Sequence, residues 1–243
     1  MPMRESSARD LTNQEPPAAR FDLRRLEAKG AAPSLWLLGL ADPIGRALEH
    51  ANDLSAEERS RADRFFRAED RTRFVLTRAA LRSLLGEATG CPPKDIAFET
   101  GAYGKPHLAH GRGPHFNVSH SGSFALIGIS DRPIGVDIEL MRDTFDELAL
   151  ARAFFCEDEH HFLAGLERPA QLQSFYKIWT CKEAVLKAFG VGISNYLMDF
   201  SIELTPDGFR IRPKLECFTP RLTAVLAEPV EAPPGYAAAV ALA

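Results

Sequence analysis

Apolar runs of strand length alternate with polar and glycine-containing breaks along much of the chain. The run "SLWLLGLAD" at 34–42 predicts a first strand. The stretch "FNVSHSGSFALIGIS" at 116–130 predicts two strands with a break at Ser119–Gly122, and "GVDIEL" at 135–140 predicts the next strand. Four later segments also have the pattern of strands: "MDFSIEL", "GFRIRPKL", "RLTAVLAE" and "YAAAVALA".

The arginine-rich segment that follows the first predicted strand has residues at the spacing of a helix. Ser55 and Glu58 form a capping-box signature at its start. We expect helix from there to Gly86 or Gly90, interrupted near 68–70. Arginines and leucines in its second part recur at helical spacing, so the leucines are expected to pack inward.

A second helical region begins near Thr144 and includes the amphipathic segment "AQLQSFYKIWTCKEAVLKAFG", which Gly190 ends. The order of elements predicts an α+β fold with two similar halves. We place the N-terminal half at 21–131 and the C-terminal half at 132–243. The polar residues 1–20 are expected to form a disordered tail.

Composition limits the class of protein. The 243 residues are 45% hydrophobic and 26% charged, as in ordinary globular proteins. No apolar run reaches the roughly 18 residues of a membrane helix, and the N-terminus lacks a signal peptide's apolar core. The four cysteines are widely spaced, which argues against a zinc site or a disulfide framework. We therefore expect a cytoplasmic protein that does not bind membranes.

Charge is unevenly distributed. The net charge of −4 argues against a nucleic-acid-binding protein, yet eight arginines fall within residues 59–82. Such a concentration of cations suggests a local anion site. The alternative is a solvated helix face.

Two carboxylates interrupt the strand at 135–140. Asp137 and Glu139 are two residues apart, so both side chains point to one side of the strand. Carboxylates this close repel each other unless a cation lies between them, and a hard cation such as Mg²⁺ accepts carboxylate and phosphate oxygens. The alternative is a polar strand face exposed to water.

A third carboxylate lies on the second helical segment. Phe175, Trp179, Glu183 and Lys187 recur every four residues and so share one helix face. The aromatic side chains indicate that this face is partly covered, so Glu183 and Lys187 are candidates for the wall of a site. The alternative is a surface salt bridge of a few tenths of a kcal/mol.

The break at Ser119–Gly122 gathers hydroxyls, the His120 imidazole and a glycine. Gly122 could turn backbone N–H groups toward an anion, which would make a phosphate cradle. The alternative is a structural histidine. The chain has neither the P-loop motif nor the Rossmann dinucleotide motif.

Taken together, these stretches resemble the 4′-phosphopantetheinyl transferases, specifically the larger, monomeric Sfp-type branch. The arginine-rich "RFFRAEDRTRFVLTRAALR" is similar to the N-terminal helices of that family. The other matching stretches are "GKP" at Gly104–Pro106, "FNVSHS" at Phe116–Ser121, "GVDIE" at Gly135–Glu139 and "FYKIWTCKEAVLKAFGVGI" at Phe175–Ile193.

The resemblance implies two α+β halves related by pseudo-two-fold symmetry, with the active site between them. It implies transfer of the 4′-phosphopantetheine arm of coenzyme A to a serine of an apo acyl or peptidyl carrier protein, releasing adenosine 3′,5′-bisphosphate. Mg²⁺, or alternatively Mn²⁺, would be held by Asp137, Glu139 and Glu183. Glu183 would also act as general base, Lys187 would neutralise or protonate the leaving phosphate, and Lys182 would contact the pyrophosphate.

The resemblance also implies a set of residues that bind coenzyme A. Ser119 and His120 would contact the region of the 3′-phosphate. Further phosphate contacts would come from Arg61, Arg73 and Arg78. The adenine would be held, largely through backbone and side-chain stem contacts, by Tyr103, Gly104, Lys105 and Pro106.

Carrier domains are typically acidic around their serine, so a basic or apolar patch should receive them. Candidates are Phe154–Phe155 and the stretch 190–197, with core packing as the alternative for the two phenylalanines. The pathway of the carrier stays open. Two other functions stay open as well: a non-catalytic module that binds coenzyme A or carrier protein, and a metal-dependent phosphohydrolase using the Asp137/Glu139 pair.

Overall fold

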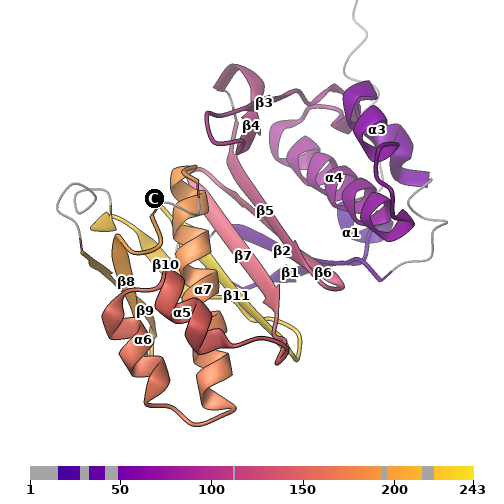
Figure 1. Cartoon of the computed structure of the whole chain (residues 1–243). Coiled ribbons are helices and arrows are strands. Elements are labelled where there is room, and N and C mark those ends of the chain that lie inside the picture. Colours follow the sequence, from indigo (N-terminus) through magenta and orange to yellow (C-terminus); the bar gives the residue numbers. More distant parts are fainter. Residues whose placement is uncertain (1–15, 28–32, 42–48, 112, 193–195, 215–221) are drawn as a thin grey trace, which may run out of the picture.

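Two antiparallel sheets lie at the centre of the molecule, and a long helix covers the outer face of each (Figure 1). The computed structural model describes residues 16–27, 33–41, 49–111, 113–192, 196–214 and 222–243. The first sheet has the strand order β1-β2-β6-β5, with β1 Leu23–Leu26, β2 Ser34–Gly39, β5 His115–Ser121 and β6 Phe124–Ser130. The second has the order β10-β11-β7, with β7 Ile134–Leu140, β10 Leu226–Pro229 and β11 Tyr236–Leu242.

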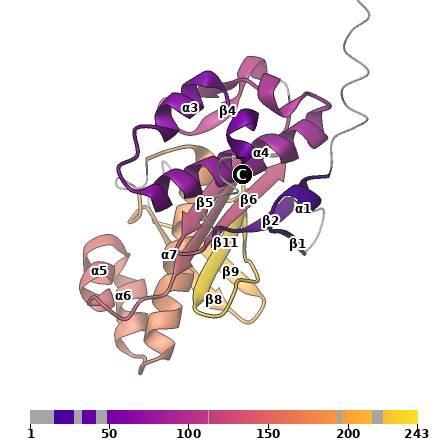
Figure 2. The same ribbon diagram turned by 90° about the vertical axis from the view of Figure 1, so that its right-hand side faces the viewer.

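The remaining elements surround these sheets. Two small hairpins are formed by β3 Phe98–Thr100 with β4 Pro106–Leu108, and by β8 Phe200–Thr205 with β9 Gly208–Pro213. The helices are α1 Pro17–Arg20, α3 Ala56–Ala62, α4 Ala68–Thr89, α5 Glu147–Phe154, α6 Glu157–Ala164 and α7 Ala170–Phe189. Figure 2 shows α3 and α4 at one end of the molecule and α5 and α6 at the other. No helix of the described ranges is long and apolar enough to cross a membrane.

The two halves of the chain share one connectivity. In each, a strand of the sheet is followed, with other elements between, by a long helix and then by two further strands of the same sheet, and the last of these pairs between the other two: β2, α4, β5, β6 and then β7, α7, β10, β11. Both long helices end at a left-handed glycine, Gly90 with φ 69° and Gly190 with φ 67°. This common order confirms the predicted α+β fold with two similar halves.

Three apolar clusters hold the layers together. One joins α4 to the outer face of the first sheet, and a second joins α7 to the alanines of β11. The third lies between the sheets, where alternate residues of β2 meet those of β7 and β11. Because Val136 and Ile138 point into this third cluster, Asp137 and Glu139 point the other way, toward α7.

Gly135 allows α7 to lie against β7. A Cβ at this position would lie 2.0 Å from the Ala184 carbonyl oxygen and 2.4 Å from the Ala188 nitrogen. We expect Gly135→Ala to lower the free energy of unfolding by about 1–3 kcal/mol or more, because neither backbone can yield without moving the helix. Urea unfolding measures this, with Gly101→Ala as control, since a Cβ there meets nothing closer than 3.5 Å. Equal midpoints for the two variants would contradict the close approach.

The capping box is confirmed: Glu58 N donates to Ser55 Oγ at 3.2 Å, and Ser55 N donates to Glu58 Oε2 at 2.9 Å. The helical interruption falls at 63–67, before the predicted position, and α4 continues to Gly90. The predicted tail is wrong at its end, because Pro17–Arg20 is helical and Arg20 pairs with Asp53 at 2.5 Å; residues 1–15 lie outside the described ranges.

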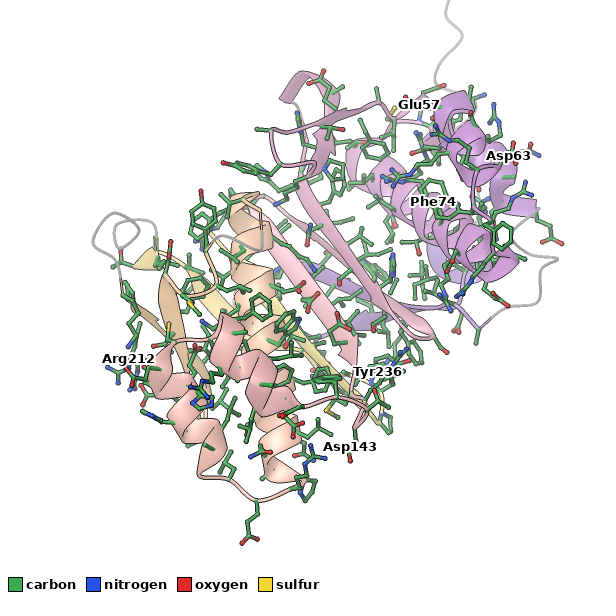
Figure 3. All side chains as sticks on the ribbon, in the orientation of Figure 1. Glu57, Asp63, Phe74, Asp143, Arg212 and Tyr236 are labelled. Carbon is green, nitrogen blue, oxygen red and sulfur yellow. The ribbon has the colours of Figure 1, made fainter. Side chains whose placement is uncertain are left out.

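The predicted break at Ser119–Gly122 is also wrong in position. Strand β5 continues through Ser121, so the turn contains only Gly122 and Ser123. A Cβ on Gly122 would lie 2.3 Å from the Tyr236 hydroxyl, which accepts a hydrogen bond from Ser123 N at 2.9 Å. Tyr236 is labelled in Figure 3, at the end of the β5–β6 hairpin. The glycine therefore serves a packed turn, in which Ser123 N is bonded to Tyr236.

Candidate active site

Side chains of β5 and β7 meet where the two sheets adjoin. Ser119 Oγ donates to Asp137 Oδ1 at 2.7 Å, and Ser121 Oγ donates to Glu139 Oε2 at 2.8 Å. Asn117, two residues before Ser119, accepts from the backbone of β7. The alternation of these side chains along β5 therefore lines up three polar groups against the carboxylate strand.

Helix α7 adds a carboxylate and an ammonium to this cluster. Lys187 Nζ lies 2.6 Å from Asp137 Oδ1, 3.0 Å from Glu183 Oε2 and 3.3 Å from Ser119 Oγ. The i,i+4 spacing predicted for Glu183 and Lys187 gives one helix face, which lies over β7. The structure thus brings together Asp137, Glu139, Glu183 and Lys187 as the sequence suggested.

The carboxylates of this cluster are crowded and poorly solvated. Burial, and next the charge of Asp137, raise the pKa of Glu183 to about 7, although Lys187 opposes both. Burial also raises the pKa of Glu139. Asp137 is fully buried, and its Oδ2 has no hydrogen-bond partner. The cluster therefore has more negative charge than Lys187 alone compensates.

The chemistry of these side chains fits a hard cation. Within the described ranges, no three His, Cys, Asp or Glu side chains already converge as a metal site. Lys187 lies between Asp137 and Glu183 and binds both. The unpartnered oxygen of Asp137, among three carboxylates, is nevertheless the kind of donor that such a cation takes.

A pocket of about 470 Å³ lies between α4 and β5. Arg61, Arg73 and Arg78 line it, together with His120. Arg73 pairs with Asp70 at 3.1 Å, and Arg78 lies 3.4 Å from Glu58. The remaining wall is formed by Phe65, Asp70, Phe74, Thr77, Leu81, Gly104, Pro106, Asn117 and Val118. We call this space the arginine pocket; Phe74, labelled in Figure 3, comes from α4.

Sequence reasoning missed part of this wall. Phe74, Thr77 and Leu81 recur at helical spacing, and this signal could have marked the face of α4 that meets the pocket. On β5, the polar residues Asn117, Ser119 and Ser121 alternate with a period of two. This pattern could have marked the strand face that meets β7.

Ser119 and His120 do not act on the same space. Successive side chains of a strand point to opposite faces, so Ser119 bonds Asp137 while His120 lines the arginine pocket. The expectation that Ser119 contacts the 3′-phosphate region with His120 is therefore corrected: Ser119 belongs to the carboxylate cluster.

Lys182 lies on the far side of α7 from the carboxylate cluster. Its side chain is fully buried, 2.9 Å from Glu159 Oε2, and donates to the carbonyls of Leu197 and Phe200 at 2.6 and 2.5 Å. Because adjacent residues of a helix point about 100° apart, Lys182 cannot share the cluster of Glu183. The predicted contact of Lys182 with a pyrophosphate is corrected on this ground.

The four residues expected to hold the adenine, Tyr103–Pro106, lie in different surroundings. Gly104 and Pro106 line the arginine pocket, whereas Tyr103 is 59% exposed. The Lys105 ammonium is directed away from the pocket, toward three backbone carbonyls.

The two phenylalanines proposed for carrier docking also differ. Phe155 is buried and stacked on Phe175, so core packing accounts for it. Phe154 is 38% exposed and lies edge-on to Trp179. In the stretch 190–197, residues 193–195 lie outside the described ranges, and Leu197 is buried.

A carboxylate cluster next to an arginine-lined pocket, in an α+β fold of two similar halves, is an arrangement suited to a phosphorylated ligand. Comparison with known families agrees and is more specific. Residues 133–241 match the model of the 4′-phosphopantetheinyl transferase superfamily, and residues 42–131 match that of the 4′-phosphopantetheinyl transferase N-terminal region. The chain belongs to this family, in its Sfp-type branch, and is a 4′-phosphopantetheinyl transferase.

Individual relatives support this membership. A putative 4′-phosphopantetheinyl transferase of Synechocystis sp. is 41% identical, over 68% of this chain and 68% of its own length. The 4′-phosphopantetheinyl transferase HetI of Nostoc sp. is 40% identical, over 71% of this chain and 74% of its own. The 4′-phosphopantetheinyl transferase Sfp of Bacillus subtilis is 35% identical, over 64% and 68%.

Proposed function

We propose that this enzyme transfers the 4′-phosphopantetheine arm of coenzyme A to a serine of an apo acyl or peptidyl carrier protein, releasing adenosine 3′,5′-bisphosphate. The observation that carries the proposal is the position of the arginine pocket across β5 from the carboxylate cluster. A cationic pocket suits the phosphorylated nucleoside end of coenzyme A. The carboxylate cluster suits a metal-bound pyrophosphate.

Asp137, Glu139 and Glu183 would hold Mg²⁺, with Mn²⁺ as the alternative ion. The unpartnered Asp137 Oδ2 and the crowding of the three carboxylates support this assignment. When bound, the ion would stabilise negative charge on the pyrophosphate oxygens.

The side chains of the cluster have separate roles in the proposed transfer. The carrier serine oxygen attacks the β-phosphorus, and the bond from that phosphorus to the bridging oxygen breaks. Glu183, which lies beside Lys187 in the cluster, would accept the serine proton in addition to holding the ion. Lys187, whose ammonium already contacts two carboxylates, would neutralise the leaving phosphate.

The arginine pocket gives a prediction about substrate recognition. We expect Arg61→Ala and Arg73→Ala each to raise KM for coenzyme A about 10-fold or more, since a hydrogen bond to a charged group contributes about 1.5–3 kcal/mol. Dephospho-coenzyme A, which lacks the 3′-phosphate, should show a much smaller change. Steady-state kinetics with both substrates measures this.

Arg71→Ala is the matched control for the arginine variants. Arg71 lies on α4, as Arg73 does, but pairs with Asp63 in solvent, away from the pocket wall. If the Arg61 and Arg73 variants bind both substrates as the wild type does, the 3′-phosphate does not lie in this pocket.

An apolar patch near the cluster is our candidate for carrier docking. The exposed Phe154 lies edge-on to the half-buried Trp179, which is one helical turn before Glu183 on α7. A carrier contacting Phe154 would bring its serine near the carboxylates. We further propose that the enzyme acts as a monomer, because one chain supplies both the pocket and the cluster.

We also propose that the enzyme acts in the cytoplasm, without nucleic-acid or membrane partners. Cys91, Cys156 and Cys181 are unpaired thiols, which suits a reducing compartment. The net charge of −4 gives no general attraction for polyanions.

The test of this function is the intact mass of an apo carrier protein incubated with the enzyme, coenzyme A and Mg²⁺. We expect a gain of one phosphopantetheinyl group, abolished by a chelator and restored by excess Mg²⁺. No gain on acyl and peptidyl carriers, with coenzyme A still bound, would favour a non-catalytic binding module. Release of nucleotide without a carrier would favour a phosphohydrolase.

A further inference from the structure

Lys105 connects two parts of the site that belong to different halves of the chain. It lies in the loop between β3 and β4, and its ammonium donates to the carbonyls of Ile134 at 2.8 Å, Lys187 at 2.6 Å and Ala188 at 3.2 Å. Ile134 begins β7, and the other two residues lie in the last turn of α7. One side chain of the N-terminal half therefore holds both elements that carry the carboxylate cluster.

The chemistry of this contact is favourable on both sides. The last carbonyls of a helix have no partner within the helix, and a lysine near this end also interacts favourably with the helix dipole. An ammonium has three hydrogens to donate, and here all three have carbonyl acceptors. Burial lowers the pKa of Lys105 to about 8, so the amine is mostly protonated at neutral pH.

The backbone around Lys105 lies in the wall of the arginine pocket. Gly104 and Pro106, on either side of it, line that pocket. At the other end of the contact, the Lys187 carbonyl is held by Lys105, while the Lys187 ammonium reaches Asp137. The pocket wall and the carboxylate cluster are thus joined through the backbone of Lys187.

We propose that Lys105 is a positioning residue that fixes α7, and Lys187 in particular, relative to the arginine pocket. This inference rests on the proposed function, in which coenzyme A spans the pocket and the cluster. With its three hydrogens engaged by carbonyls, the Lys105 ammonium does not bind a substrate phosphate. It sets the distance between the arginine pocket and Lys187, which bound coenzyme A must span.

The test compares a ligand that fills one subsite with a substrate that spans both. Adenosine 3′,5′-bisphosphate would occupy the arginine pocket alone. For Lys105→Met, we expect its Kd to stay within about threefold of wild type while kcat for transfer falls at least about 10-fold, since small misplacements cost large factors in rate. Lys177→Met is the control, because Lys177 is an exposed lysine of α7, the helix that Lys105 contacts.

A double variant tests whether Lys105 acts through Lys187. If it does, Lys105→Met should change the rate less than about threefold in a Lys187→Ala background, because effects within one coupled unit do not add. If Lys105 only stabilises the fold, Lys105→Met should lower the melting temperature and leave kcat of the folded fraction unchanged. That result would overturn the proposal. Equal weakening of bisphosphate binding and of transfer would also overturn it, in favour of direct phosphate contact.

Amide hydrogen exchange tests the Lys105 contact independently of phosphopantetheine transfer. Lys105→Met should speed exchange at the C-terminal turn of α7, residues 187–191, and Lys177→Met should not. Unchanged exchange in both variants overturns the positioning role even if the wild type transfers normally. If the wild type transfers to no carrier, the proposed function fails, and faster exchange in Lys105→Met would still support the contact itself.

Discussion

Asp137→Asn is expected to slow phosphopantetheine transfer about a thousandfold, equivalent to about 4 kcal/mol of transition-state stabilisation. The substitution removes a charged oxygen from the carboxylate cluster while keeping the shape of the side chain. Asparagine can still accept the hydrogen bond from Ser119 Oγ, so the fold should persist. Initial rates from carrier mass, at saturating coenzyme A and Mg²⁺, measure the effect.

The control for this variant is Asp207→Asn, since Asp207 is an exposed carboxylate in the turn between β8 and β9. It should transfer at the wild-type rate. A folded Asp137→Asn enzyme with near-normal turnover would refute the assignment of the cluster as the reacting centre.

The second large effect is on stability rather than rate. Lys182→Met is expected to lower the free energy of unfolding by about 3–5 kcal/mol, because it leaves the buried Glu159 carboxylate without its cation. The rate of transfer per folded molecule should stay near wild type, since Lys182 does not reach the carboxylate cluster. Urea unfolding at 25 °C, with rates normalised to the folded fraction, measures both quantities.

A paired variant separates the two explanations for a loss of activity. Glu159 also accepts hydrogen bonds from the backbone N–H groups of Cys156 at 2.8 Å and Ile202 at 2.7 Å. Lys182→Met/Glu159→Gln removes the uncompensated charge and should recover part of the lost stability. If Lys182→Met had normal stability and a hundredfold lower rate of transfer, Lys182 would take part in catalysis.

The sequence was sufficient for features that depend on local periodicity. The two-residue spacing of Asp137 and Glu139 predicted a shared strand face, and the four-residue spacing of Glu183 and Lys187 predicted a shared helix face. The structure places these two faces against each other. The family resemblance supplied the link between them, because periodicity alone does not say which strand a helix covers.

The errors arose where long-range partners decide what a side chain does. Lys182 and Glu183 are adjacent in sequence, and only the position of α6 shows that Lys182 faces Glu159. The sequence also showed no sign of the partners of the Lys105 ammonium, which donates to carbonyls at the end of α7; the predicted adenine contact through the backbone and stem of Lys105 stays a prediction. The break before Gly122 was placed too early because Ser119 and Ser121 are polar, although their partners are the carboxylates of β7.

In the proposed function, Asp137, Glu139 and Glu183 together hold a divalent cation that serves coenzyme A. The most direct measurement is electron paramagnetic resonance of Mn²⁺ added to metal-stripped protein, with and without coenzyme A. We predict one Mn²⁺ bound per chain, more tightly with coenzyme A present, and loss of this site in Asp137→Asn. Equal Mn²⁺ binding by wild type and Asp137→Asn, or no binding by the wild type with coenzyme A, would contradict the account.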